Sequence, residues 1–318
     1  MQTRSSRLSA RSFARVKILV AVLSVCLLLG SLALHAQTTT STIDSSAPFS
    51  WAANFGWTNW RPSSTDGAVI GEYVLSGYLY AANVGWISLG SGAPANGIQY
   101  ANNSASDFGV NFLPSTTPGV ALLRGYAYGA NIGWINFEGT GNPQVNLQTG
   151  ALSGYAWSAN CGWINLGTGT IYAVKTLSIS PGRDSDGDGI ADAFELTYFG
   201  NLTTATATSD FDGDGVSDRD EYLEGTNPKD PGDRLRIVSV AKTSSASQDT
   251  TSLLFTSTPT RLYNVQTTTN LLDPGSWGPS PLGTFLPDAG PTTGRDVITG
   301  PTATQRFYRV QAIRPLSP

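Results

Sequence analysis

"WAANFGWTNW" occupies residues 51–60, and the same pattern returns as "YAANVGWISLG", "YGANIGWINFEG" and "WSANCGWINLG" at 80–90, 128–139 and 157–167. Each copy places an aromatic residue, an Asn, a Gly and a Trp in the same order. The Trp that follows the Gly recurs after 29, 48 and 29 residues, so the copies form two pairs with an insertion between them. A fixed period of this size is typical of a repeat architecture.

Each copy has the pattern of a β-hairpin. In the last copy, Tyr155 and Trp157 point to one face of a strand, while Ala156 points to the other. Asn160 and Gly162 tolerate the positive φ angles of a tight turn. Another turn at 149–150 precedes this strand. Each unit is therefore expected to be a β-meander of about three strands.

The Tyr and Trp rings of the copies have two possible uses. We expect them to stack between neighbouring units as core, because large side chains at alternating positions bury well and each repeat needs its neighbour. The alternative is a row of exposed rings that stack on sugars. Cys161 takes the position of Phe55, Val84 and Ile132 in the other copies, and we interpret it as a small apolar residue. An intermolecular disulfide is its alternative.

The N-terminus has the order of a secretory signal peptide. Five basic residues precede an apolar run over 18–34, and a small residue follows at Ala36. We predict cleavage near Ala36, with an uncleaved anchor as the alternative. The chain after residue 36 has 14 basic and 23 acidic residues, no His, and Cys161 as its one Cys. These counts exclude Ser-His-Asp and Cys-His catalytic pairs, a His-ligated zinc and an internal disulfide.

The segment 183–233 is strongly acidic, with 14 acidic and three basic residues. "DSDGDGIADAFE" at 184–195 and "DFDGDGVSDRDE" at 210–221 share one pattern. It supplies carboxylates at loop positions 1, 3, 5, 9 and 12, a Gly at 6 and a backbone carbonyl at 7, as a calcium ion with six to eight oxygen ligands requires. The predicted ligands are Asp184, Asp186, Asp188, Ile190, Asp192 and Glu195 in the first loop, and Asp210, Asp212, Asp214, Val216, Asp218 and Glu221 in the second.

These loops resemble EF-hand and thrombospondin type 3 calcium repeats of secreted bacterial proteins. The resemblance covers about 50 residues and implies calcium, Ca2+, as the bound ion. The apolar Ile190 and Val216 stand one position earlier than an EF-hand would place them, and no clear helix precedes either loop. A static, calcium-stapled repeat is therefore favoured over a paired EF-hand switch. Short helices are expected after each loop, the second ending at Gly225.

The remaining segment returns to strand patterns, at "LRIVSV", "SLLFTS", "RLYNVQ", "RDVIT" and "RFYRVQAI" between 235 and 313. The sequence thus predicts a mainly β protein. It has a signal peptide at 1–36, a repeat β-meander domain at 37–178, a small calcium-loop module with short helices at 179–233, and a C-terminal β-sandwich at 234–318.

The preferred function is a secreted or cell-surface, calcium-binding structural or adhesion protein that is not an enzyme, without catalytic residues or an organic cofactor. Its alternative is a carbohydrate-binding protein that uses the Tyr and Trp faces of the repeats. The candidate partners are a cell-surface glycan or another envelope protein. A negative net charge disfavours nucleic acid, and no segment after the signal is predicted to span a membrane. An enzyme is the least supported interpretation, with Glu138 and Asp107 as its best acids.

Overall fold

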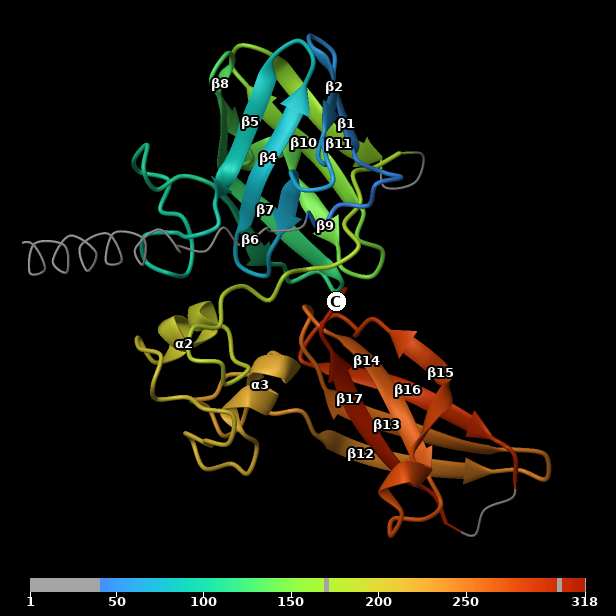
Figure 1. Ribbon diagram of the computed structural model, residues 1–318. Coiled ribbons are helices and arrows are strands. Elements are labelled where there is room, and N and C mark those ends of the chain that lie inside the picture. The colour runs from blue at the N-terminus through green and yellow to red at the C-terminus, as the bar shows by residue number, and fades with distance from the viewer. Residues whose placement is uncertain (1–40, 169–171, 302–304, 318) are drawn as a thin grey trace, which may run out of the picture. The chain divides into compact units, whose positions relative to one another are not determined.

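The four aromatic hairpins close into one antiparallel, barrel-like sheet of eight strands (Figure 1). The strand order is β11-β1-β2-β4-β5-β7-β8-β10, and β10 pairs in turn with β11. The bounds are β1 Phe49–Ala52, β2 Gly56–Asn59, β4 Leu75–Ala81, β5 Gly85–Ser91, β7 Val120–Gly129, β8 Gly133–Asn136, β10 Leu152–Ser158 and β11 Gly162–Thr168. Three short strands and a 3-10 helix complete this part: β3 Ala68–Ile70, β6 Val110–Pro114, η1 Gly139–Gly141 and β9 Gln144–Asn146.

The computed structural model describes residues 41–168, 172–301 and 305–317. The predicted signal peptide at 1–36 lies outside these residues. The described residues belong to one compact unit, and the domain boundaries proposed within it stay predictions. Among the described residues, no helix combines the length and the apolar character that crossing a membrane would need.

The expectation that the repeat aromatics form the core is wrong. The Trp residues after the Gly, Trp57, Trp86, Trp134 and Trp163, are 46–53% exposed. The other face of the same strands fills the interior, where Leu79 lies opposite Ile87, and Ala156 opposite Ile164. Strand alternation groups the residues of one face correctly, but the aliphatic face is the one turned inward.

The hairpin tips are joined in a closed ring of side-chain hydrogen bonds. The turn Asn of each hairpin donates its amide to a backbone carbonyl of the preceding hairpin, at 3.0–3.1 Å. The four bonds run from Asn54 to Cys161, Asn83 to Phe55, Asn131 to Val84, and Asn160 to Ile132. The acceptor residues bury their own side chains at this end of the sheet, Cys161 among them, which agrees with a small apolar role. The Gly that follows each has φ between 71° and 90°, which only Gly adopts freely.

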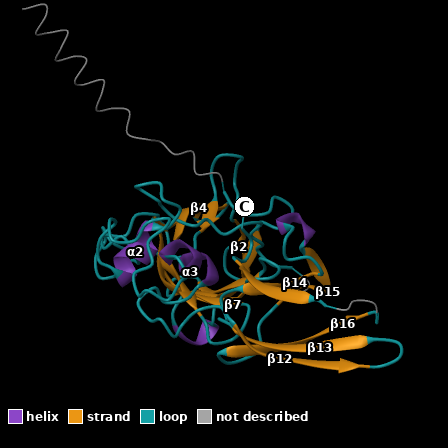
Figure 2. Cartoon of the chain, turned by 90° about the horizontal axis from the view of Figure 1, so that it is seen from below, coloured by secondary structure: helices purple, strands orange, loops and turns teal. Residues whose placement is uncertain are grey.

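The C-terminal part consists of two facing three-stranded sheets, β12-β13-β16 and β15-β14-β17, visible as two layers in Figure 2. Leu253, Val265 and Val297 are buried together and come from both sheets, so the predicted sandwich is confirmed. All five predicted strands form, and β15 is an additional one that Gly and Pro in its sequence concealed. The bounds are β12 Ile237–Ser244, β13 Asp249–Thr256, β14 Leu262–Thr268, η2 Pro274–Ser276, β15 Gly278–Phe285, β16 Thr292–Thr299 and β17 Phe307–Ile313.

The acidic segment carries two short helices, as predicted: α2 Asp192–Tyr198 and α3 Asp218–Glu224. Ser217 caps α3 by accepting a hydrogen bond from the Asp220 N–H, and Gly225 ends it with φ 75°. Ile190, Phe194 and Tyr222 form a small core that holds both helices together. The apolar residue at loop position 7 thus anchors the first loop to the helices.

Candidate metal centre

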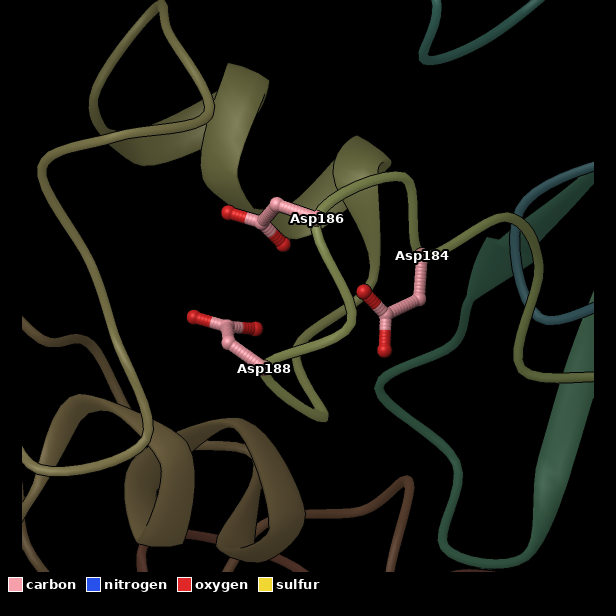
Figure 3. A group of neighbouring side chains, drawn as sticks. All are labelled: Asp184, Asp186 and Asp188. Atoms are coloured by element: carbon pink, nitrogen blue, oxygen red, sulfur yellow. The ribbon is translucent and has the colours of Figure 1, made fainter.

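Each acidic loop gathers its first three carboxylates into a cluster. In both loops, carboxylate oxygens from positions 1, 3 and 5 lie within 4.8 Å of one another. Figure 3 shows the three side chains of the first loop facing a common space. The two clusters are Asp184, Asp186 and Asp188, and Asp210, Asp212 and Asp214.

Backbone N–H groups hold the position-1 carboxylates in place. Asp184 accepts hydrogen bonds from Gly187 at 2.7 Å and from Gly189 at 3.0 Å. Asp210 accepts the matching bonds from Gly213 at 2.8 Å and Gly215 at 2.9 Å. The two loops therefore fold alike, because each Gly, at positive φ, lets its N–H turn inward.

The glutamates at position 12 are buried and do not belong to these clusters, but the charges of the cluster aspartates act on them. Glu195 and Glu221 are fully buried, in the first turns of α2 and α3. Among the described residues, neither oxygen of Glu195 has a hydrogen-bond partner, while Glu221 keeps one bond, from Thr226 Oγ1 at 3.2 Å. Buried carboxylates without partners are costly, so these oxygens call for a cation.

The pKa values of these glutamates show the same cost. Burial, and then the negative charge of Asp186, raises the pKa of Glu195 from 4.5 to about 7. Burial, and then Asp212, raises the pKa of Glu221 to about 8. The pKa values of Asp188 and Asp212 are also raised, chiefly by burial. A divalent cation would reverse all of these shifts, because it stabilises the charged forms.

The aspartates at position 9 have a different environment. Asp192 accepts hydrogen bonds from the Ser185 N–H and Oγ–H, at 2.7 and 2.6 Å. Asp218 accepts from the Phe211 N–H at 3.0 Å and from Ser209 Oγ at 2.5 Å. They join the start of each loop to its helix, outside the position 1, 3 and 5 clusters. Their ligation, like that of the Ile190 and Val216 carbonyls, stays a prediction.

Basic residues that the loop pattern did not mark also border the clusters. Arg234 Nη1 lies 3.3 Å from the Asp214 carboxylate and donates to the Asp214 carbonyl at 2.7 Å. A Cβ on Gly189 would stand 2.9 Å from Arg219 Nε, so Arg219 crosses the first loop closely. Arg219 lies within the second loop and Arg234 lies after it, and neither gave a signal in a pattern of oxygen ligands.

The two repeats also contact each other directly. The rings of Phe199, after α2, and Phe211, in the second loop, have centroids 5.1 Å apart. Lys229 donates to the Tyr198 carbonyl at 3.2 Å and lies over the Phe211 ring. These contacts pack the two repeats against each other.

A family model of the bacterial TSP3 repeat matches residues 184–200 and 210–231, which contain both loops and both helices. Repeats of this family bind calcium and occur in extracellular proteins. No curated protein and no solved structure showed significant similarity to the chain. The donors fit such an ion, because they are hard oxygen ligands and include buried carboxylates without partners.

Proposed function

We propose that this chain is a calcium-binding structural protein of the extracellular space or cell surface that acts without catalysis, in adhesion or in a matrix. The burial of Glu195 and Glu221 without adequate partners, in loops that each gather three aspartates into a matching cluster, carries this proposal. Each glutamate links a loop to a helix. In each loop, a calcium ion held by the aspartates and the glutamate would fix the helix to the loop and supply the missing positive charge.

The contacts of α3 indicate what this fixation stabilises. The Tyr222 hydroxyl donates to Glu72 Oε2, in the repeat part, at 3.2 Å. Arg261, in the sandwich, donates to the carbonyls of Tyr222 and Leu223, both at 2.8 Å. Since Tyr222 directly follows Glu221, order at the second calcium loop would support the helix that both neighbouring parts contact.

The Glu72 carboxylate lies at the centre of these contacts. It pairs with Arg314 at 2.6 Å and with Arg261 at 3.3 Å, and Arg314 also lies over the Tyr222 ring. These side chains are 8–18% exposed, so solvent screens the pairs only weakly. We infer a static calcium staple rather than a switch that opens a groove.

The acids named as the best catalytic candidates support a structural role. Asp107 accepts the backbone N–H groups of Ala95 and Ala101, both at 3.1 Å, and so holds the loop between β5 and β6. Glu138 is exposed. The order of repeat part, calcium module and sandwich supports the proposal of an adhesive or matrix role.

Calorimetry of the purified protein tests the proposal. Scans are run with calcium, with magnesium and with EDTA. At calcium ten times Kd, each site should add about 1.4 kcal/mol to the free energy of unfolding. Magnesium should add less, because it retains its waters. A transition unmoved by calcium or EDTA contradicts the proposal.

A further inference from the structure

Four nearly identical aromatic pairs project from the outer face of the closed sheet. In each hairpin the Trp after the Gly stands directly opposite an aromatic residue of the partner strand. Ring centroids are 4.9–5.1 Å apart and the planes meet at 61–63°. The "aromatic pairs" are Trp51–Trp57, Tyr80–Trp86, Tyr128–Trp134 and Trp157–Trp163, and their rings are 39–53% exposed.

Sheet stability explains only part of this arrangement. A cross-strand aromatic pair contributes about 0.2–1 kcal/mol. We call the Trp that follows the turn Gly the central Trp of its pair. Each central Trp contacts at least one further ring, at centroid distances of 5.1–6.4 Å. These added rings are Phe49 and Tyr172, Tyr78, Phe108 and Tyr126, and Tyr155. Keeping so much aromatic surface in water, in four equal copies, points to a ligand.

Neutral polar side chains separate the pairs around the sheet. The residue two places after each central Trp is Asn59, Ser88, Asn136 or Asn165. Each stands opposite the first member of the next aromatic pair, namely Tyr80, Tyr128, Trp157 and Trp51. The outer band thus alternates aromatic pair and polar side chain through all four hairpins, with no break where β11 meets β1.

Backbone hydrogen bonds fix these polar side chains. The side-chain Oδ1 atoms of Asn59, Asn136 and Asn165 each accept a hydrogen bond from the backbone N–H two residues later. Ser88 Oγ accepts the matching bond from the Gly90 N–H at 3.3 Å. Each hairpin therefore offers a rigid ring face beside a polar group of defined orientation, which limits the entropy lost on binding.

The near absence of charged residues on the strands of the closed sheet indicates which kind of ligand could bind there. Of the eight strands of the closed sheet, seven contain no charged residue and β7 contains only Arg124. An anionic or cationic ligand would find little to pair with. A lipid surface needs a continuous apolar patch, which the polar side chains interrupt. A neutral sugar ring fits both features, since its C–H face packs on an aromatic ring while its hydroxyls bond to amides.

We propose that the four aromatic pairs are equivalent binding sites for neutral polysaccharide. Because successive hairpins follow one another around a closed sheet, the sites face different directions. One chain can then hold several glycan strands and cross-link them, with avidity from multiple weak sites. These sites are separate from the calcium loops and need no calcium ligand.

A retention assay tests this inference. The purified protein is mixed with cellulose, chitin, curdlan and cross-linked dextran particles, and in a separate arm with phosphatidylcholine vesicles. Variants replace Trp57, Trp86, Trp134 and Trp163 with Ala, singly and together. The matched control is Leu272→Ala, which removes a 94% exposed apolar side chain from the sandwich. A cooperative calorimetric unfolding transition confirms folding of each variant.

We expect retention on at least one polysaccharide, progressive weakening across the single variants, and at least a tenfold loss in the quadruple variant. The control should bind as the unmodified protein does. On the unmodified protein, a soluble oligosaccharide of the retained glycan should protect tryptophan fluorescence from acrylamide quenching, a readout independent of variant folding. Retention on no polysaccharide, equal retention of the quadruple variant, or binding to vesicles alone would overturn the proposal. Calcium binding is measured separately, so either proposal can fail alone.

Discussion

Replacing Glu221 with Gln should make the protein more stable without calcium and should halve the stability that calcium adds. In the metal-free protein, burial raises the pKa of Glu221 from 4.5 to about 8. A carboxyl group whose pKa is higher in the folded than in the unfolded protein destabilises the fold once the pH rises above its pKa in the unfolded chain. At pH 7 this amounts to on the order of 3 kcal/mol, from about 1.4 kcal/mol for each pH unit above 4.5. The neutral amide removes that cost.

Calcium should narrow this difference in stability. At ten times Kd, two sites add about 3 kcal/mol to the unmodified protein. A variant that loses the second site should gain only about half of this. Hydrogen exchange of α3 amides, measured in EDTA and in calcium, reports both quantities, because an opening free energy that changes by 1.4 kcal/mol changes the exchange rate tenfold.

Glu224→Gln is the matched control for this variant. Glu224 lies in the same helix, and burial also raises its pKa, to about 7, but it belongs to neither loop. Its replacement should give a similar gain without calcium and leave the calcium response intact. A Glu221→Gln protein with an unmodified calcium response would refute the assignment of Glu221 as a ligand.

Three other predictions follow from the same structure. Trp60→Ala should lower the free energy of unfolding by about 3–5 kcal/mol, because Trp60 is 1% exposed and donates to Ser50 Oγ inside the sheet. Trp86→Ala should lower it by no more than about 1 kcal/mol. Equal losses in calorimetry would contradict the assignment of the aliphatic face of the strands to the interior. Calcium affinity should rise from pH 6 to 8, because calcium must displace protons from the position-12 glutamates, whose pKa values in the metal-free protein are about 7 and 8. Titration calorimetry in buffers of different ionisation enthalpy should detect the released protons. An affinity that does not change with pH would contradict this prediction. Glu72→Gln should speed hydrogen exchange of the α3 amides at least tenfold, because it leaves Arg261 and Arg314 without their shared carboxylate. The control Asp66→Asn, at an exposed position, should leave the exchange rate unchanged. An unchanged rate in Glu72→Gln would show that these ion pairs contribute little to the stability of α3.

The local features of the fold could be predicted from sequence because short-range chemistry determines them. The turn Gly residues, the helices after both loops and the position 1, 3 and 5 carboxylates all depend on neighbours a few residues away. The raised pKa of Glu195 and Glu221 follows from burial, which the loop pattern does not show.

The closed sheet could not be predicted in the same way. Closure depends on pairing β1 with β11, more than 100 residues apart. Period-2 alternation assigns Trp86 and Ile87 to opposite faces but does not say which one meets water. The size of the rings suggested burial. The interior of a small barrel instead has room for the aliphatic side chains and for Trp60, and the other Trp residues of the repeats remain outside.

Calcium stoichiometry is the most direct test of the proposed function. Equilibrium dialysis of the purified protein against radioactive calcium at pH 8 should give two saturable sites per chain. Glu195→Gln and Glu221→Gln should each reduce this to one, and the double variant should bind none. Zero saturable sites in the unmodified protein, or two sites that survive in the double variant, would contradict the assignment of these loops as a calcium staple.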